Sequence, residues 1–294
     1  KYAFGKKMIL NKIGEWDLRI LETGDFKLDG GAMMGSVPKV LWSKTNPSDD
    51  KNRIDLSMRC LLLDNGKRRV LIETGIGDHY SEKFAEIFQV NQEKNALSKA
   101  LSNYGYINEN ITDVILTHLH FDHVGGAVLK NSDGNMYPRF PNATYYISQT
   151  NWDAGMNPSP KDKASYLKEN YICLKDQGVL EIIPDNVNIV DGIDTYTVNG
   201  HTHGQQLVKI SSNDSTIVFC SDLIPLKSHI KVPWIMGYDL NAELTMKEKE
   251  IFLKKASDEG WILFLYHDPE VAAVKIDMNN NNYRVIDELR RKRN

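Results

Sequence analysis

Apolar and polar residues alternate along the chain with the periods of strands and helices, so the elements can be predicted from their order. Residues 17–28 alternate with the two-residue period of a half-buried strand. Two apolar runs, residues 57–63 and 68–75, flank the sequence Asp-Asn-Gly and predict a β-hairpin. Residues 111–117 are β-branched and apolar, as expected for a strand buried on both faces. Further strands are expected over residues 143–148, 178–184, 194–200, 206–212, 215–222 and 261–268.

A helical period replaces the strand period in several segments between these runs. Residues 80–103 are expected to form one helix, with Ser81 as its N-cap and Gly105 as its stop. A loop and a helix are expected near residues 150–177. Residues 30–52 are rich in Gly, Pro, Asn and Asp, which predicts a long loop. This loop could be a lid over an active site or a contact to a second copy of the chain.

The clearest helical pattern covers residues 244–260. Thr245 and Glu248 are spaced as a capping box, and Gly260 stands where a helix usually ends. The apolar face of this helix would contain Leu244, Ile251 and Phe252.

Two strand-rich blocks, each followed by helices, predict an α/β fold with two sheets inside and helices outside. The chain has 294 residues, of which 41% are hydrophobic, enough for a substantial core. Because packed sheet architectures can reach roughly 250 residues as one unit, residues 1–294 are interpreted as a single domain.

Charge and cysteine content narrow the range of partners. Lys and Arg number 36 against 39 Asp and Glu, a net charge of −3, so no broad basic surface for nucleic acid is expected. The basic residues 288–294 are interpreted as a solvated helix end. Cys60, Cys173 and Cys220 are too far apart for a zinc pair or a disulfide framework, which favours reduced thiols and a cytoplasmic protein.

No run of about 18 apolar residues occurs, so no membrane-spanning segment is expected. The chain begins at Lys1 rather than methionine, which leaves open a leader removed upstream. A homodimer is a further open expectation.

Three of the eight histidines lie within six residues, directly after the strand expected over residues 111–117. His118 and His120 point to one side if the strand geometry continues, and Asp122 keeps that alternation. His123 then opens a turn into two glycines, which permit close packing. Imidazoles and a carboxylate suit a divalent metal such as zinc, and four candidates in six residues indicate two ions. The alternative is a set of surface histidines in a polar loop.

Three later positions, His201, Asp222 and His267, also lie where apolar strands end. A carboxylate can bridge two cations through its two oxygens, which suits Asp222. Taken alone, Asp222 could be a helix cap and His267 a structural histidine. Their shared position at strand ends favours one common site.

These residues together resemble the ligand set of the metallo-β-lactamase superfamily. The resemblance implies a four-layer αββα sandwich of two mixed sheets, with the metals at one edge of the paired sheets. Glu73 matches a carboxylate, usually Asp in the family, that orients a ligating histidine. His203 and Gln205 replace a proline and a histidine of the family pattern. The implied ligands are His118, His120 and His201 for the first metal and Asp122, His123 and His267 for the second, with Asp222 bridging.

An aspartate at position 222 resembles glyoxalase II, lactonases, phosphodiesterases and organophosphate hydrolases rather than true β-lactamases. Flavo-diiron oxidoreductases usually have Glu where His120 stands, so two zinc ions are expected rather than iron. Two ions would lower the pKa of a shared water from about 16 towards neutrality and provide a bridging hydroxide. Asp122 would accept a proton from the attacking water, and Asp222 would assist proton transfer to the leaving group.

The expected function is therefore zinc-dependent hydrolysis of a small-molecule ester, lactone or phosphoester. In the segment after Asp222, His229 could donate to the substrate, although a solvent-exposed loop histidine is as good an interpretation. An apolar pocket could be lined by Met33, Trp234, Met236 and Tyr238, although such residues more often belong to a core.

Lactonases of this superfamily present a tyrosine shortly after the bridging aspartate, and none stands there in this chain. Three alternatives remain: a glyoxalase II-like thioester hydrolase, a ribonuclease Z-like nuclease and a non-catalytic protein that holds metal and binds a ligand. The acidic net charge counts against the nuclease.

Overall fold

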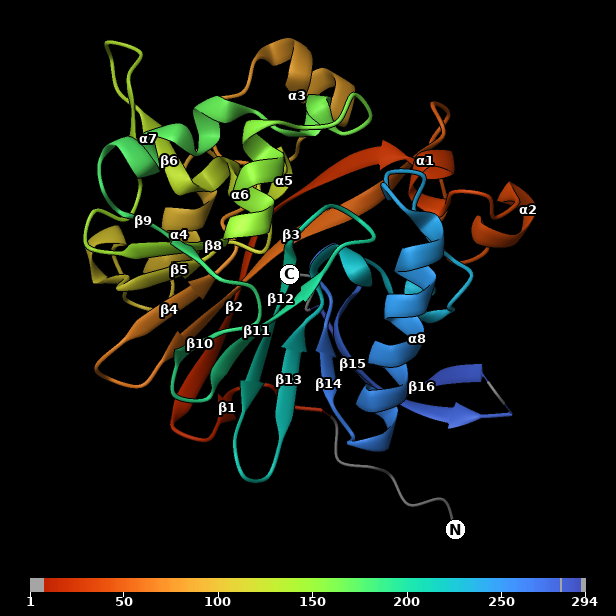
Figure 1. Ribbon diagram of the computed structural model, residues 1–294. Coiled ribbons are helices and arrows are strands. Elements are labelled where there is room, and N and C mark those ends of the chain that lie inside the picture. The colour runs from red at the N-terminus through yellow and green to blue at the C-terminus, as the bar shows by residue number, and fades with distance from the viewer. Residues whose placement is uncertain (1–7, 281, 292–294) are drawn as a thin grey trace.

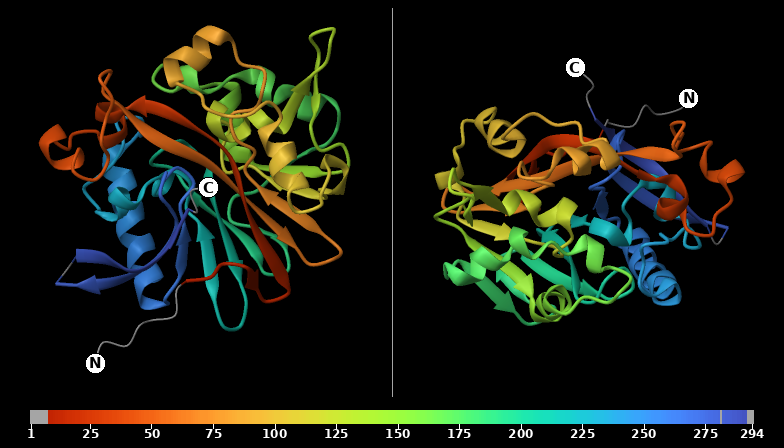
Figure 2. Two further views of the ribbon diagram at one scale, coloured as in Figure 1. Left: turned by 180° about the vertical axis from the view of Figure 1, so that it is seen from behind. Right: turned by 90° about the horizontal axis from the view of Figure 1, so that it is seen from above.

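Two mixed sheets lie face to face at the centre of the molecule, with helices on their outer sides (Figures 1 and 2). The computed structural model describes residues 8–280 and 282–291. Within these residues each sheet has seven strands, and β6 (Val128–Lys130) and β7 (Met136–Pro138) form a separate small pair. The four-layer αββα sandwich predicted from the sequence is confirmed.

The first sheet combines an antiparallel half with a parallel half. Its first four strands are antiparallel, and the β3–β4 hairpin around Gly66 confirms the turn prediction. Its remaining strands run parallel to β4, so they end at the same edge of the sheet. In sheet order the strands are β1 (Lys12–Ile13), β2 (Trp16–Asp29), β3 (Arg53–Asp64), β4 (Arg69–Ile72), β5 (Asp113–Ile115), β8 (Thr144–Ser148) and β9 (Leu180–Ile183).

The second sheet is antiparallel except for one parallel pair, β13 with β14. Its last hairpin, β15 with β16, was not predicted. Residues 288–290 belong to strand β16, so their interpretation as a helix end is wrong, and residues 292–294 lie outside the described residues. The strands are β10 (Asn188–Val190), β11 (Ile193–Val198), β12 (Gln205–Ser211), β13 (Thr216–Phe219), β14 (Ile262–Phe264), β15 (Val271–Asn279) and β16 (Asn282–Arg290).

Both faces of the central strand β13 are buried, which explains its continuous apolar run. Ile217 and Phe219 of β13 point into the core between the sheets, whereas Val218 points to the other face. That outer face is covered by Phe252 and Leu253 of helix α8 (Ala242–Asp258). Figure 1 shows this helix lying along the second sheet.

Helix α8 begins three residues before the expected cap. Asn241 is the N-cap and accepts a hydrogen bond from the Leu244 N–H, so the capping box at Thr245 and Glu248 is wrong. The predicted stop is confirmed, because the helix ends at Asp258 and Gly260 has a φ of +67°. Phe252 is buried, but Ile251 is 63% exposed and does not share its face.

The single helix expected over residues 80–103 is two helices, α3 (Glu82–Phe88) and α4 (Ala96–Ser102). Ser81 caps the first as predicted. Gln89 has a left-handed backbone, and the Asn91 N–H donates to the Asp25 carbonyl of strand β2 at 2.7 Å. This strand-like pairing breaks the helix.

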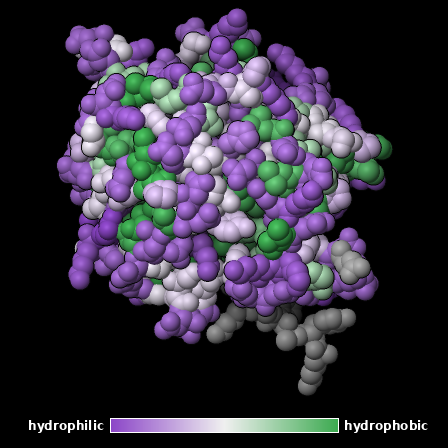
Figure 3. Space-filling view, in the orientation of Figure 1, coloured by the Kyte–Doolittle hydropathy of each residue, from purple (hydrophilic) through white to green (hydrophobic). Residues whose placement is uncertain are grey.

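The expected loop over residues 30–52 contains two short helices, α1 (Gly30–Met34) and α2 (Lys39–Trp42), because Asp29 caps the first through the Ala32 N–H. The remaining α-helices are α5 (Phe121–Val124), α6 (Gln149–Met156) and α7 (Ile172–Asp176). No helix of the described residues combines the length and apolarity needed to cross a bilayer. On the face seen in Figure 3, apolar residues lie in separate groups among hydrophilic ones.

Candidate metal centre

The chain brings the seven predicted ligands together at one edge of the sandwich. Four of them follow β5, one lies between β11 and β12, one follows β13 and one follows β14. All seven side chains are at least 90% buried, so the alternative of surface histidines in a loop is wrong for this cluster. The seven residues are His118, His120, Asp122, His123, His201, Asp222 and His267.

Three histidines form a first group around one oxygen of Asp222. The Nδ1 atom of His120 lies 3.1 Å from His118 Nε2 and 3.3 Å from His201 Nε2. The Asp222 Oδ2 atom is 3.2 Å from His201 Nε2 and 4.0 Å from His118 Nε2.

A second group surrounds the other oxygen of Asp222. The Nε2 atoms of His123 and His267 are 3.2 Å apart, and they lie 3.5 and 3.3 Å from Asp222 Oδ1. Asp122 Oδ2 is 3.5 Å from His267 Nε2. Ligands about 2.1 Å from a tetrahedral zinc ion are separated by roughly 3.4 Å. Both groups therefore have the spacing of one ion each.

Hydrogen bonds on the far side of the rings fix which nitrogen carries the proton. His267 Nδ1 must donate to the Ser57 carbonyl at 3.0 Å, because a carbonyl only accepts. His123 Nδ1 likewise faces the Glu73 carboxylate at 2.9 Å, and His201 Nδ1 faces Asp239 at 2.9 Å. In the neutral rings the Nε2 lone pairs then point at each other and at Asp222. Opposed lone pairs at these distances repel each other unless a proton or a metal ion lies between them, so the residues fit bound metal.

The electrostatics of the site also favour a cation. Burial, with the neighbouring histidines, holds the pKa of His118 and His120 well below the ordinary value, which keeps both neutral. Burial opposes charge on Asp222 and His123 too. Nevertheless, the histidines around Asp222 hold its pKa well below the ordinary value, and Asp222, Asp122 and Glu73 raise the pKa of His123 well above it. Carboxylates that favour a proton at His123 favour a metal ion there for the same reason.

The local backbone differs from the expected strand alternation. Strand β5 ends at Ile115, and Asp122 and His123 belong to the single helical turn α5. The glycines that follow pack closely, as predicted: a Cβ on Gly126 would lie 2.0 Å from the Thr74 carbonyl oxygen. Asp222 lies in a 3-10 turn, Ser221–Leu223, and is not a helix cap.

Several supporting residues were missed from the sequence. The Glu248 carboxylate accepts from the Asn199 and Gly200 N–H groups at 2.7 and 2.9 Å, directly before His201. With its amide oxygen turned towards them, Gln205 accepts from the N–H groups of Asp222 at 2.7 Å and Leu223 at 3.2 Å. These contacts join positions far apart in sequence, so no local pattern marks them.

A cavity of about 400 Å³ opens at the two groups. Met33, Met236 and Tyr238 lie on its wall as the sequence suggested. Leu28, Phe88 and Phe121 extend the apolar side, whereas Lys161, Asp162 and Ser165 form a polar side.

Two predicted pocket residues lie elsewhere. His229 is 1% exposed, and its Nε2 donates to the Met33 carbonyl at 2.9 Å, so both the substrate contact and the exposed-loop interpretation are wrong. Trp234 is half-buried beneath the Lys231 ammonium, 4.2 Å from the ring centre, and does not line the cavity.

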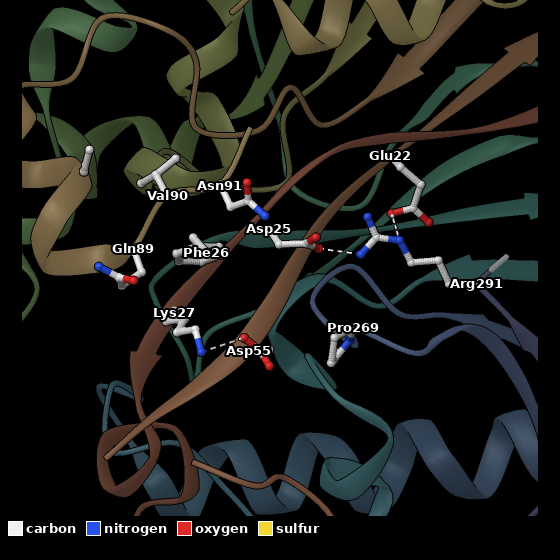
Figure 4. A pocket seen from close by; sticks show the side chains of 11 residues that line it. Glu22, Asp25, Phe26, Lys27, Asp55, Gln89, Val90, Asn91, Pro269 and Arg291 are labelled. Atoms are coloured by element: carbon white, nitrogen blue, oxygen red, sulfur yellow. Dashed lines mark hydrogen bonds and ion pairs between the residues drawn. The ribbon is translucent and has the colours of Figure 1, made fainter. Parts of the chain in front are cut away.

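A larger cavity of about 960 Å³ lies beside strand β2 (Figure 4). Its charged side chains pair with each other: Arg291 with Asp25, and Lys27 with Asp55 at 3.0 Å. Because these charged side chains already pair with each other, they are less available to a substrate than the ligand groups at the other cavity.

Comparisons with known proteins show what the chain is similar to. The family model described as metallo-beta-lactamase superfamily matches residues 57–267. An N-acyl homoserine lactonase of Bacillus cereus is 27% identical over 233 residues, covering 74% of this chain and 84% of the relative.

Two solved structures extend the likeness to nearly the whole chain. A probable metal-dependent hydrolase from Staphylococcus aureus is 29% identical, with a TM-score of 0.87 over 96% of this chain and 99% of that chain. A dizinc quorum-quenching lactonase, 22% identical, shares the fold with a TM-score of 0.77 over 97% of each chain.

Proposed function

The chain belongs to the metallo-beta-lactamase superfamily, and from this premise we propose that it is a hydrolase with two divalent metal ions, expected to be zinc. The observation that carries the proposal is the arrangement of Asp222 between the two ligand groups, with one oxygen 3.2 Å from His201 Nε2 and the other 3.3 Å from His267 Nε2, at one cavity. The first ion would be held by His118, His120 and His201, the second by Asp122, His123 and His267, and Asp222 would contact both.

When bound, the ions would supply an activated water and polarise the substrate oxygen. The protein itself supplies positioning and proton transfer. Asp122 lines the cavity and is 7% exposed, so its carboxylate can take a proton from a water at the site. Asp222 also faces the cavity and could pass a proton to the leaving group. Glu73 and Asp239 hold the rings of His123 and His201 in place.

We propose a lactone or ester with an apolar acyl group as the substrate. The methionine and aromatic side chains of the cavity offer an apolar surface next to the ligand groups, which suits an acyl chain. Relatives named N-acyl homoserine lactonases support this class. No tyrosine closely follows Asp222, but Tyr238 lies on the cavity wall, where its hydroxyl could reach a substrate oxygen.

The cavity is less suited to polyanionic substrates. Among its lining residues in the described part of the chain, Lys161 is the one lysine or arginine, and its ammonium donates to the Asp239 carbonyl. A nucleic acid would require several such contacts.

The proposal is tested with zinc-loaded protein and a substrate panel. The panel contains N-acyl homoserine lactones, a phosphotriester, a phosphodiester and a glutathione thioester. We expect about two zinc ions per chain and the highest kcat/KM on a lactone, with loss of turnover in Asp122→Asn. A protein that holds less than one ion per chain, or that hydrolyses nothing on the panel, would contradict the proposal.

A further inference from the structure

One wall of the cavity is made by a segment without regular structure. Residues 231–238, called the wall segment below, follow the 3-10 turn Lys227–Ile230 and precede helix α8. Met236 and Tyr238 from this segment line the cavity beside Asp222 and His267. An irregular segment has few internal hydrogen bonds, so its position must be fixed from outside.

A buried lysine on helix α8 provides such a contact. Lys249 is completely buried, and its ammonium donates to three main-chain carbonyls of the wall segment. The distances are 2.9 Å to Lys231, 3.3 Å to Val232 and 2.6 Å to Trp234. Three N–H donors of one ammonium thus meet three acceptors on a turn of chain.

Burying a lysine ammonium costs free energy unless hydrogen bonds compensate for the lost hydration. Burial lowers the pKa of Lys249 to about 7, against the opposing effect of Asp239. A methionine would fill the same volume without this desolvation, but it would remove the lysine donor from the Val232 and Trp234 carbonyls of two half-buried residues, whereas the Lys231 carbonyl would keep the Trp234 N–H. Apolar packing alone therefore does not explain a lysine at position 249.

The wall segment is also tied to the opposite side of the cavity. The Gly237 N–H donates to the Ala32 carbonyl at 2.7 Å, and His229, in the turn directly before the wall segment, donates to the Met33 carbonyl. Met33 belongs to α1 and lines the same cavity. Movement of the wall segment would therefore move Met33 as well as Met236 and Tyr238.

We propose that Lys249 is a positioning residue for the substrate: it holds the wall segment so that the apolar side of the cavity fits an acyl group. The inference rests on the proposed hydrolase function. Lys249 does not line the cavity, and its ammonium donates to the wall segment rather than to the ligand groups. Asp239 follows the wall segment, accepts from the Met236 N–H and faces His201. We expect the main effect on substrate affinity, and zinc content shows whether a change reaches His201.

The test compares Lys249→Met and Lys249→Gln with wild type, using N-decanoyl and N-butanoyl homoserine lactone as probes. For the decanoyl probe we expect KM to rise about tenfold in the methionine variant and about threefold in the glutamine variant, which keeps two donors. We expect kcat to change less than twofold, the butanoyl KM to change little, and zinc content to stay at the wild-type value. Lys247→Met is the control, because Lys247 is exposed on the same helix and pairs with Glu243.

Amide hydrogen exchange gives a readout that does not need turnover. Peptides covering residues 231–241 should exchange faster in both Lys249 variants than in wild type, while peptides of strands β12 and β13 should not change. Unchanged decanoyl KM together with unchanged exchange would overturn the proposal, as would loss of zinc in parallel with kcat. If wild type hydrolyses neither probe, the proposed lactone substrate fails while the metal content and the rest of the panel still test the hydrolase, and hydrogen exchange still decides whether Lys249 holds the wall segment.

Discussion

Replacing Glu73 by glutamine should weaken binding of the second metal ion and leave binding of the first nearly unchanged. The buried Glu73 carboxylate accepts from the Thr117 N–H at 2.6 Å and faces His123 Nδ1 at 2.9 Å. A glutamine has one oxygen for these two donors, so one donor must face the amide NH2 group. Hydrogen bonds to charged groups contribute about 1.5–3 kcal/mol, and every 1.4 kcal/mol is tenfold in affinity. We therefore expect roughly 10- to 100-fold weaker binding of the second ion.

Asp239 offers the matched perturbation at the first ion. Its Oδ1 atom faces His201 Nδ1 at 2.9 Å, and its Oδ2 accepts from the Met236 N–H at 3.1 Å. Asp239→Asn should weaken binding of the first ion by a similar factor and leave the affinity for the second ion nearly unchanged. Glu243→Gln removes an exposed carboxylate on α8 and should change neither.

The assay is zinc titration of metal-free protein against a chromophoric chelator, fitted to two affinities. The two variants should lower the affinity of different steps of the titration. Glu73→Gln and Asp239→Asn that lower the same step, or that both leave the titration unchanged, would refute a separate role for each carboxylate. A single step in wild type would argue against two ions sharing Asp222.

Three further predictions concern stability. Removing metal with a chelator should lower Tm by about 10 °C. A free metal concentration of about 1,000 times Kd stabilises the folded state by about 4 kcal/mol, and each kcal/mol shifts Tm by about 2–4 °C. Calorimetry that finds an unchanged Tm would contradict this prediction. Gly126→Ala should destabilise the fold by about 1–3 kcal/mol in urea denaturation, since its Cβ would overlap the Thr74 carbonyl oxygen; wild-type stability would mean that this turn can shift. Burial raises the pKa of Asp64, but the Tyr106 hydroxyl at 2.6 Å, the Gly66 N–H and Arg69 together outweigh burial and lower it. The ionised Asp64 carboxylate therefore stabilises the folded state above about pH 4, and this contribution is lost as the pH falls through the folded-state pKa. Tyr106→Phe should therefore cost about 1 kcal/mol at about pH 7, and the cost should shrink as the pH falls through the folded-state pKa. A cost that does not change with pH would exclude the ionised carboxylate as the cause.

The positions that come together at the ligand cluster could be predicted because each depends on a short-range signal. An apolar strand of three to six residues ends, and a histidine or aspartate follows, as in β13 before Asp222 and β14 before His267. Parallel pairing of β13 with β14 then brings these two ends to the same edge of the sheet. The alternation of strand residues did not carry over to Asp122, because the chain turns into a helix after His120.

Two of the errors come from competition with distant contacts. Residues 80–103 have helical propensity throughout, but Asn91 pairs with β2, and this pairing outweighs propensity over seven residues. Likewise, Glu248 matched a capping box with Thr245, yet its carboxylate instead accepts from N–H groups nearly 50 positions earlier in the chain. The role of Asp239 also depends on a ring 38 positions away, so nothing in its own neighbourhood marks it.

Two adjacent residues of α8 link the proposed metal centre to the cavity wall. Glu248 is an acceptor for the N–H groups before His201, and Lys249 is a donor to the carbonyls of the wall segment. Both irregular segments are therefore held by the same helix, which packs on the outer face of the second sheet through Phe252 and Leu253. Because neighbouring residues on a helix point about 100° apart, one helix can hold two segments in different directions. The spacing between the ligand groups and the apolar wall thus follows from the packing of α8 rather than from the propensities of either segment.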